Sequence, residues 1–151
     1  TTEIYTLSLH DALPIYAECG GLMYLCQGLV DFEGQRWPMV GCLPTTAQMT
    51  GKLTLGYRQI TVQRDSPLVK TGQTFWGHEF HRSALTVAPL SPLYQTQPYG
   101  IVNQPLPAPQ AEGWQQYQIH ASYVHLHWGS HPELPQRFID TCRHQPSEWA
   151  S

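Results

Sequence analysis

The chain has 151 residues, a length that fits one domain with a hydrophobic core. Charged residues make up 13% of it, and its 12 glycines and 13 prolines predict a structure rich in loops. The formal net charge is −3 without a basic run, so nucleic acid is not an expected partner. The apolar stretches fall short of the ~18 residues that a membrane span needs, and no signal segment opens the chain, so we expect no membrane association and a cytoplasmic protein.

The N-terminal part predicts a strand, a sharp turn and a helix. Residues 1–13 show no convincing hydrophobic period, and we expect a non-native or unstructured tail there. Apolar residues 15–17 predict a short buried strand that ends at the turn 19–21. Apolar residues at helical spacing then predict a helix that two glycines bring to an end: Leu22, Leu25, Cys26 and Leu29, with Gly28 and Gly34.

The middle of the chain predicts a long strand over residues 52–62. Its apolar side chains change phase along the strand, and a bulge near residues 56–59 would produce that change. We expect a loop at residues 77–83 and a short strand at 85–88.

The remaining chain begins with an irregular passage. Six prolines between Pro89 and Pro109 predict a long loop, because proline interrupts helices and central strands. A pair of strands is expected over residues 117–128. A helix over Glu133–Arg143 then closes the chain, since its apolar residues share one face.

Cys19 is the candidate nucleophile. A reactive side chain on a strand-to-helix turn needs small neighbours, and the segment AECGG at residues 17–21 supplies them. The amide of Gly20 is the natural donor to an oxyanion, and the helix start favours a thiolate. The alternative is a buried structural cysteine, the role expected for the other three cysteines. No C-x-x-C pair occurs, which indicates reduced thiols: Cys19, Cys26, Cys42 and Cys142.

A base for this thiol is offered by two histidines. If residues 123–128 form a strand, Tyr123, His125 and His127 share one of its faces. The alternative is that these rings simply line a strand edge.

Metal and phosphate sites are not expected. His78 and His81 are one residue too close for the H-E-x-x-H zinc motif. Gly72 and Gly77 have the spacing of a P-loop, but His and Glu follow where Lys and Ser or Thr belong. We therefore expect no metal and no cofactor bound by this chain.

Four segments together resemble the cobyrinic acid a,c-diamide synthases, corrin-amidating enzymes of cobalamin biosynthesis. The most specific is YAECGGLMYL at residues 16–25. The others follow in the family's order: KLTLGYR at 52–58, GHEFHRS at 77–83 and ASYVHLHW at 121–128.

The resemblance implies an α/β fold, the sheet of a class I (triad-type) glutamine amidotransferase flanked by helices, over residues 14–151. It also implies that Cys19 attacks glutamine, that His125 raises its nucleophilicity, and that ammonia amidates the a and c carboxylates of a corrin, cobyrinic or hydrogenobyrinic acid. ATP and Mg would serve an N-terminal synthetase domain, which this sequence lacks. An upstream loop with a second oxyanion donor is also missing, so we expect an N-terminally truncated domain that is inactive on its own.

The family pattern leaves several assignments open. Many class I members carry Glu two residues after the catalytic His, where this chain has His127, which favours a Cys-His dyad. His131, followed by Pro and Glu, is a second candidate base. For substrate binding we expect Lys52 or Arg58 at the α-carboxylate of glutamine, together with His81.

Two other functions stay open. One is a cobyric acid synthase, although a Tyr-Leu-His-Gly sequence would then be expected where His127 and Trp128 stand. The other is a histidine-rich metal-binding or ligand-binding module without catalysis.

Overall fold

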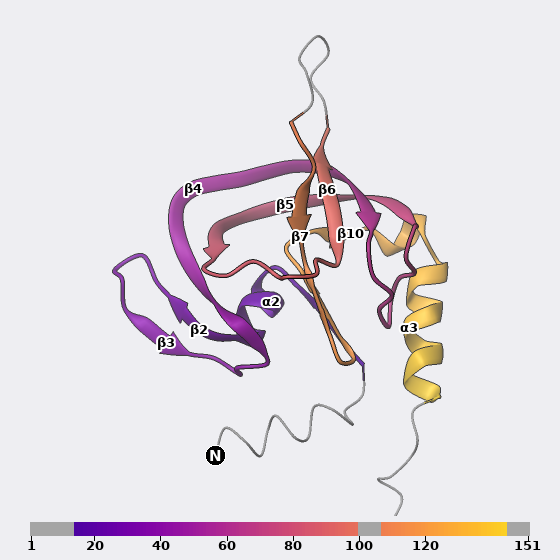
Figure 1. Cartoon of the computed structure of the whole chain (residues 1–151), viewed down its shortest axis with the longest axis horizontal. Helices are drawn as coiled ribbons and strands as arrows, with labels where there is room; N and C mark the ends of the chain where they lie inside the picture. Colours follow the sequence, from indigo (N-terminus) through magenta and orange to yellow (C-terminus); the bar gives the residue numbers. More distant parts are fainter. Residues whose placement is uncertain (1–13, 100–106, 145–151) are drawn as a thin grey trace, which may run out of the picture.

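The structure, a computed structural model, describes residues 14–99 and 107–144 (Figure 1). The tail expected at residues 1–13 lies outside these described residues. A small sheet has the order β1-β9-β8, in which β1 is parallel to β9 and β8 is antiparallel to it. Its strands are β1 (Ile15–Glu18), β8 (Trp114–Gln116) and β9 (Ile119–Ser122).

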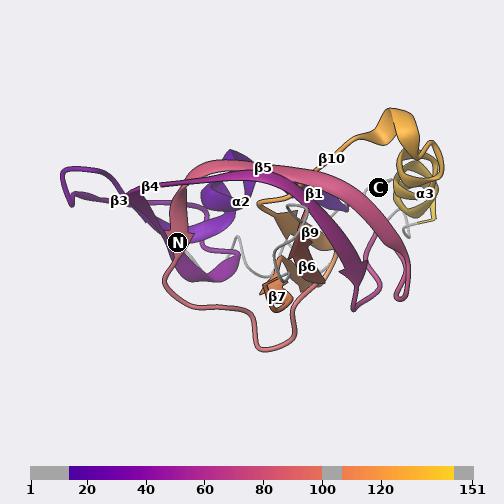
Figure 2. The ribbon, with the colours of Figure 1, turned by 90° about the horizontal axis from the view of Figure 1, so that it is seen from above.

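A larger sheet of seven strands arches over the small one (Figure 2). Its main path has the order β10-β5-β4-β2-β3, and β6 joins β4 to β7. The long antiparallel strands β4 and β5 form the arch. The strands are β2 (Cys26–Val30), β3 (Arg36–Pro38), β4 (Leu43–Val62), β5 (Thr74–Leu85), β6 (Tyr94–Pro98), β7 (Gln110–Glu112) and β10 (His125–Leu126).

Helices are few in the described part of the chain. α2 (Gly20–Leu25) follows β1, and α3 (Glu133–Arg143) packs at one end of the arch after a 3-10 turn, η1 (Trp128–Ser130) (Figure 1). No helix among the described residues is long and apolar enough to cross a membrane. The predicted α/β class is confirmed, as is the helix at Glu133–Arg143.

The first helix is shorter than predicted. It ends at Leu25, and residues 26–30 form β2 instead, parallel to β4 and antiparallel to β3. Cys26 and Gly28 are buried while Gln27 is exposed, so this segment also fits the period of a strand. The apolar residues fit the period of a helix and that of a strand. Pairing with β3 and β4 makes the segment a strand.

The predicted bulge and loop in the middle of the chain are wrong. Residues 54–61 of β4 pair with β5 without a break, and the register shift lies between Met49 and Thr54. Leu55 and Tyr57 are exposed on the outer face of the arch, whereas Ile60 and Val62 are buried on its inner face. The apparent change of phase reflects apolar residues on both faces of one continuous strand.

Three other boundaries differ from the prediction. Residues 77–83, expected as a loop, lie within β5, and the strand expected at 85–88 is only the end of β5. The proline-rich passage contains β6 and precedes β7, because its prolines lie at or beyond the strand ends. The passage also includes residues 100–106, which lie outside the described residues.

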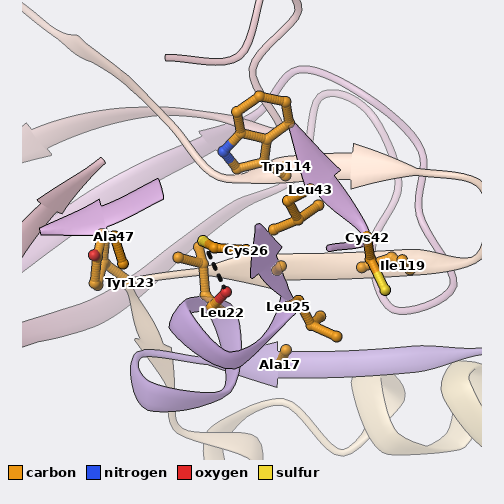
Figure 3. Close-up of a cluster of buried hydrophobic side chains, with 11 residues drawn as sticks. Ala17, Leu22, Leu25, Cys26, Cys42, Leu43, Ala47, Trp114, Ile119 and Tyr123 are labelled. Carbon is orange, nitrogen blue, oxygen red and sulfur yellow. Dashed lines mark hydrogen bonds between the residues drawn. The ribbon is translucent and has the colours of Figure 1, made fainter. Parts of the chain in front are cut away.

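A hydrophobic cluster supports the turn between β1 and α2 (Figure 3). Leu22 and Leu25 of α2 are buried against Ala17 of β1. The Cys26 thiol donates to the Leu22 carbonyl at 3.3 Å. Residue 19 is therefore held between a packed strand and a packed helix.

Candidate functional site

Cys19 lies on the sharp turn between β1 and α2, as the sequence predicts. Its φ of 50° and ψ of −105° are unusual for a residue with a side chain. The amide of Cys19 donates to Ser122 at 2.8 Å, and its carbonyl accepts from Met23 at 3.1 Å. Such strained strand-to-helix turns expose the nucleophile in several hydrolase folds.

The Cys19 thiol is partly buried and lies against β5. Its sulfur is 3.8 Å from the Phe80 carbonyl oxygen. Burial raises the pKa of the Cys19 thiol, and the Glu18 carboxylate adds to this, while the Gly20 amide acts in the opposite direction. The thiol therefore needs a base in order to react near neutral pH. Gly20 itself is exposed, with open space where a side chain would project.

His125 lies on β10, at the edge of β5. Its Nδ1 is 3.2 Å from the His78 carbonyl oxygen, and the two imidazole rings stack with centroids 4.7 Å apart. Because a carbonyl only accepts hydrogen bonds, Nδ1 of His125 carries the proton in this contact. Nε2 is then the basic nitrogen of the neutral ring.

The Cys19 thiol and the His125 ring contact β5 along the same edge. The carbonyls of His78 and Phe80 are two residues apart on one strand, so they point to the same side, roughly 6.5 to 7 Å from each other. His125 contacts the first carbonyl and Cys19 the second. The predicted nucleophile and the predicted base are thus brought to one edge of the arch.

Gly77 allows β10 to approach β5 closely. A Cβ atom on Gly77 would lie 2.4 Å from Val124 Cγ1 and 2.7 Å from the His125 carbonyl oxygen. Leu126 pairs with Gly77, and His125 with His78. The position of His125 therefore depends on a residue without a side chain at position 77.

The other two candidate histidines are placed differently. His127 lies beyond the end of β10, is exposed, and has its Nδ1 3.0 Å from the Ser130 hydroxyl. The expectation that it shares a strand face with His125 is wrong, since β10 ends at Leu126. His131 lies just before α3, where its Nδ1 is 3.1 Å from a carboxylate oxygen of Glu133.

His81 lies next to Phe80, the residue that Cys19 contacts. Its ring stacks on Tyr123 with centroids 4.0 Å apart, and its Nδ1 is 2.9 Å from the Ser83 carbonyl oxygen. Among the described residues, Nε2 of His81 has no hydrogen-bond partner although it is buried. Burial lowers the pKa of His81, so the neutral ring presents Nε2 as an acceptor.

The predicted cationic residues lie elsewhere on β4. Arg58 has its Nε 2.7 Å from a carboxylate oxygen of Glu79, and both side chains are largely buried. Lys52 is exposed within the irregular stretch of β4. The structure brings His81 to the Cys19 region and leaves Arg58 in an ion pair.

Glu112 is a polar residue of this region that the sequence analysis missed. Its carboxylate accepts from the Ser122 hydroxyl at 2.6 Å and from the Tyr123 amide at 2.7 Å. Burial raises its pKa to about 7, against the hydrogen bonds from Ser122 and Tyr123. It thus holds the link between β9, which pairs with β1, and β10, which carries His125. No motif surrounds Glu112, and it follows the proline-rich passage.

Neither a metal cluster nor a phosphate loop is formed by these residues. Within residues 14–99 and 107–144, no three His, Cys, Asp or Glu side chains gather in a group that could hold a metal ion. Gly77, which completes the P-loop spacing, lies inside the extended strand β5 and not before a helix.

Several known proteins are similar in sequence to this chain. The model of the CobB/CobQ-like glutamine amidotransferase domain matches residues 6–133. A cobyrinate a,c-diamide synthase of Synechococcus sp. is 48% identical over 137 residues, covering 90% of this chain and 29% of the relative. The corresponding enzyme of Synechocystis sp. is 43% identical, covering 89% and 27%. A hydrogenobyrinate a,c-diamide synthase of Streptomyces coelicolor is 38% identical, covering 86% and 24%.

The chain therefore belongs to the CobB/CobQ-like glutamine amidotransferase domain family. It spans less than a third of the length of these curated relatives.

Proposed function

We propose that this chain is the glutamine-hydrolysing part of an ATP-dependent cobyrinate or hydrogenobyrinate a,c-diamide synthase, acting in the cytoplasm in cobalamin biosynthesis. The observation that carries the proposal is Cys19, held at φ 50° on a strand-to-helix turn and facing the β5 edge that also receives His125. The names of the relatives favour this function over that of a cobyric acid synthase.

The reaction begins with proton transfer from Cys19. Nε2 of His125 takes the proton from the thiol, and the sulfur attacks the carboxamide carbon of glutamine. The carbonyl oxygen becomes an oxyanion that the Gly20 amide stabilises by donating a hydrogen bond. The carbon-nitrogen bond then breaks as protonated His125 gives its proton to the leaving nitrogen, and ammonia is released.

Water completes the cycle. His125, neutral again, takes a proton from water, and the resulting hydroxide attacks the thioester carbon. The carbon-sulfur bond breaks, glutamate leaves, and the sulfur regains a proton from His125. Because burial keeps Cys19 protonated in the free protein, each turnover depends on this histidine.

His81 is suited to bind the amino acid part of glutamine. Its buried Nε2 can accept a hydrogen bond from the α-ammonium group, since the neutral ring offers an acceptor there. Lys52 and Arg58 are the candidates for the α-carboxylate. Arg58 would have to bind it with Nη2, because Nε contacts Glu79 and Nη1 donates to the Tyr57 carbonyl.

The second half of the reaction would take place in another domain. Ammonia would amidate the a and c carboxylates of the corrin after ATP and Mg activate them. In support of a separate ATP site, Gly77, which completes the P-loop spacing, lies on the extended strand β5 and not before a helix. In this proposal residues 14–151 form the glutaminase domain, and the synthetase domain that binds ATP and the corrin is separate.

Site-resolved labelling tests the proposed nucleophile. The chain, joined to the synthetase domain of this proposal, is incubated with 6-diazo-5-oxo-norleucine, a glutamine analogue that releases N2 as it alkylates a thiol, and modified peptides are identified by mass spectrometry. We expect labelling at Cys19, competition by glutamine, and loss of labelling in Cys19→Ala but not in the control Cys142→Ala. Labelling of Cys19→Ala at the wild-type rate would refute the proposal.

A further inference from the structure

Glu18, directly before the nucleophile, reaches across to the strand that carries the proposed base. One of its carboxylate oxygens, Oε1, accepts a hydrogen bond from the Leu126 amide at 2.8 Å. The Tyr16 hydroxyl donates to the same oxygen. Residues 18 and 126 are far apart in the sequence, so this contact ties the end of β1 to β10.

The tie matters because β10 is a short strand. The strand has two residues, pairs with β5 on one edge, and approaches it at Gly77. Leu126 follows His125 directly, so a restraint on the Leu126 amide fixes the backbone from which the His125 ring projects. A carboxylate acceptor makes this hydrogen bond stronger than one between neutral groups.

The carboxylate is itself held in place by Tyr16. The Tyr16 ring packs against Trp128 with centroids 5.1 Å apart and against His120 at the same distance. Burial strongly raises the pKa of the Tyr16 hydroxyl, with Glu18 adding to the effect, so the hydroxyl remains protonated and donates to the carboxylate. The orientation of Glu18 is therefore fixed by the packed ring beside it.

In triad enzymes, a third group orients the histidine. Here Nδ1 of His125 contacts the carbonyl of His78, and the residue two places after His125 is a histidine. The described contacts of the His125 ring therefore include no carboxylate. A carboxylate, that of Glu18, instead restrains β10 through the backbone amide of Leu126.

We propose that Glu18 is a positioning residue that holds His125 against Cys19 through the Leu126 amide. This inference rests on the proposed function, in which His125 activates Cys19. Glu18 does not touch the substrate in this scheme. It sets the distance between the end of β1, where its own backbone lies, and β10, which carries the base.

The test measures how fast iodoacetamide alkylates Cys19 as a function of pH. Sulfur displaces iodide in this reaction, and a base that removes the thiol proton accelerates it. We expect alkylation of the wild-type protein at pH 7 to be at least tenfold faster than that of His125→Asn, and the two rates to converge at high pH, where the thiol ionises without a base. Mass spectrometry resolves Cys19 from Cys142, which serves as an internal reference within each sample.

Two substitutions of Glu18 separate positioning from general damage. Glu18→Gln keeps an oxygen acceptor for the Leu126 amide, so the rate at pH 7 should stay within about threefold of wild type. Glu18→Ala removes the acceptor and should lower the rate at pH 7 at least tenfold. Glu133→Ala, which removes an exposed carboxylate far along the chain, should match wild type.

The outcomes separate this inference from the proposed function. A wild-type profile in Glu18→Ala, or an equal loss in Glu18→Gln and Glu18→Ala, would overturn the role of Glu18 while leaving His125 as the base. If the alkylation rate of Cys142 also changes in Glu18→Ala, the substitution has unfolded the protein. That result would likewise overturn positioning as the cause. If His125→Asn matches wild type, the Cys-His pair itself is refuted, and the inference falls with it.

Discussion

Gly77 and His125 are so close that a methyl group on residue 77 would lie 2.7 Å from the His125 carbonyl oxygen. The clash would involve backbone, which cannot rotate away as a side chain can. Strand β10 therefore reaches its place beside β5 only because position 77 lacks a side chain.

Gly77→Ala should displace His125. We expect glutamine hydrolysis to fall at least tenfold and the free energy of unfolding to fall by about 1 to 3 kcal/mol, the usual cost of overpacking. The matched control is Gly51→Ala, since open space surrounds that residue. Activity assays and thermal unfolding of both variants check this, and an unchanged rate in Gly77→Ala would contradict the role given to Gly77.

His125 and His127 should differ strongly in their contribution to catalysis. His125→Asn should lower kcat for glutamine hydrolysis by ~10² or more, the usual effect of losing a general acid-base group. His127→Asn should cost much less, because His127 lies beyond β10 and contacts Ser130. Single-turnover formation of the thioester measures this step directly. If His127→Asn were the more damaging change, the two roles would have to be exchanged.

The turn between β1 and α2 could be predicted from sequence because the residues that determine it are local. A short apolar strand, small residues around Cys19 and apolar spacing after it all act within about ten residues. The structure confirms the strand, the turn and the start of the helix. The helix ends at Leu25, earlier than the sequence predicts. The reason is that β2, which begins at Cys26, pairs with residues of β4 about 17 positions further along the chain.

The environment of the site could not be predicted because it depends on contacts between distant segments. Glu18 binds the Leu126 amide, and the Cys19 sulfur contacts the Phe80 carbonyl. The neighbouring residues in the sequence do not predict which distant carbonyl or amide a side chain will contact. The same holds for Arg58, which pairs with Gly77 in the register of β4 and β5 and thereby comes diagonally next to Glu79, its ion-pair partner.

Replacing Lys52 and replacing Arg58 should have different effects on glutamine binding. If a cation binds the α-carboxylate, one of the variants Lys52→Ala and Arg58→Ala should raise KM for glutamine about tenfold or more with little change in kcat. Arg58→Ala also leaves Glu79 without its ion-pair partner, so its thermal unfolding should be measured alongside. An unchanged KM in both variants would remove both residues from the glutamine site.

Glu112 should make the stability of the protein depend on pH. Burial raises the pKa of its carboxyl to about 7, above the ordinary value of 4.5. Between these two values the folded protein holds a proton that the unfolded chain has released, so the stabilisation from Glu112 is present below pH 4.5 and is lost as the pH rises toward 7. A shift of this size corresponds to a few kcal/mol, on the order of 1.4 kcal/mol per pH unit.

Glu112→Gln should remove this dependence, since an amide keeps an acceptor for the Tyr123 amide but does not titrate. We expect the free energy of unfolding of the wild type to fall relative to the variant between pH 5 and 7, and the difference to level off above pH 7. Comparing the two proteins at each pH cancels the titration of other groups, including buried His120, whose pKa burial lowers to about 3. Urea unfolding at pH 5, 6, 7 and 8 gives the four differences. A difference that stays constant across this range would show that Glu112 does not titrate within it.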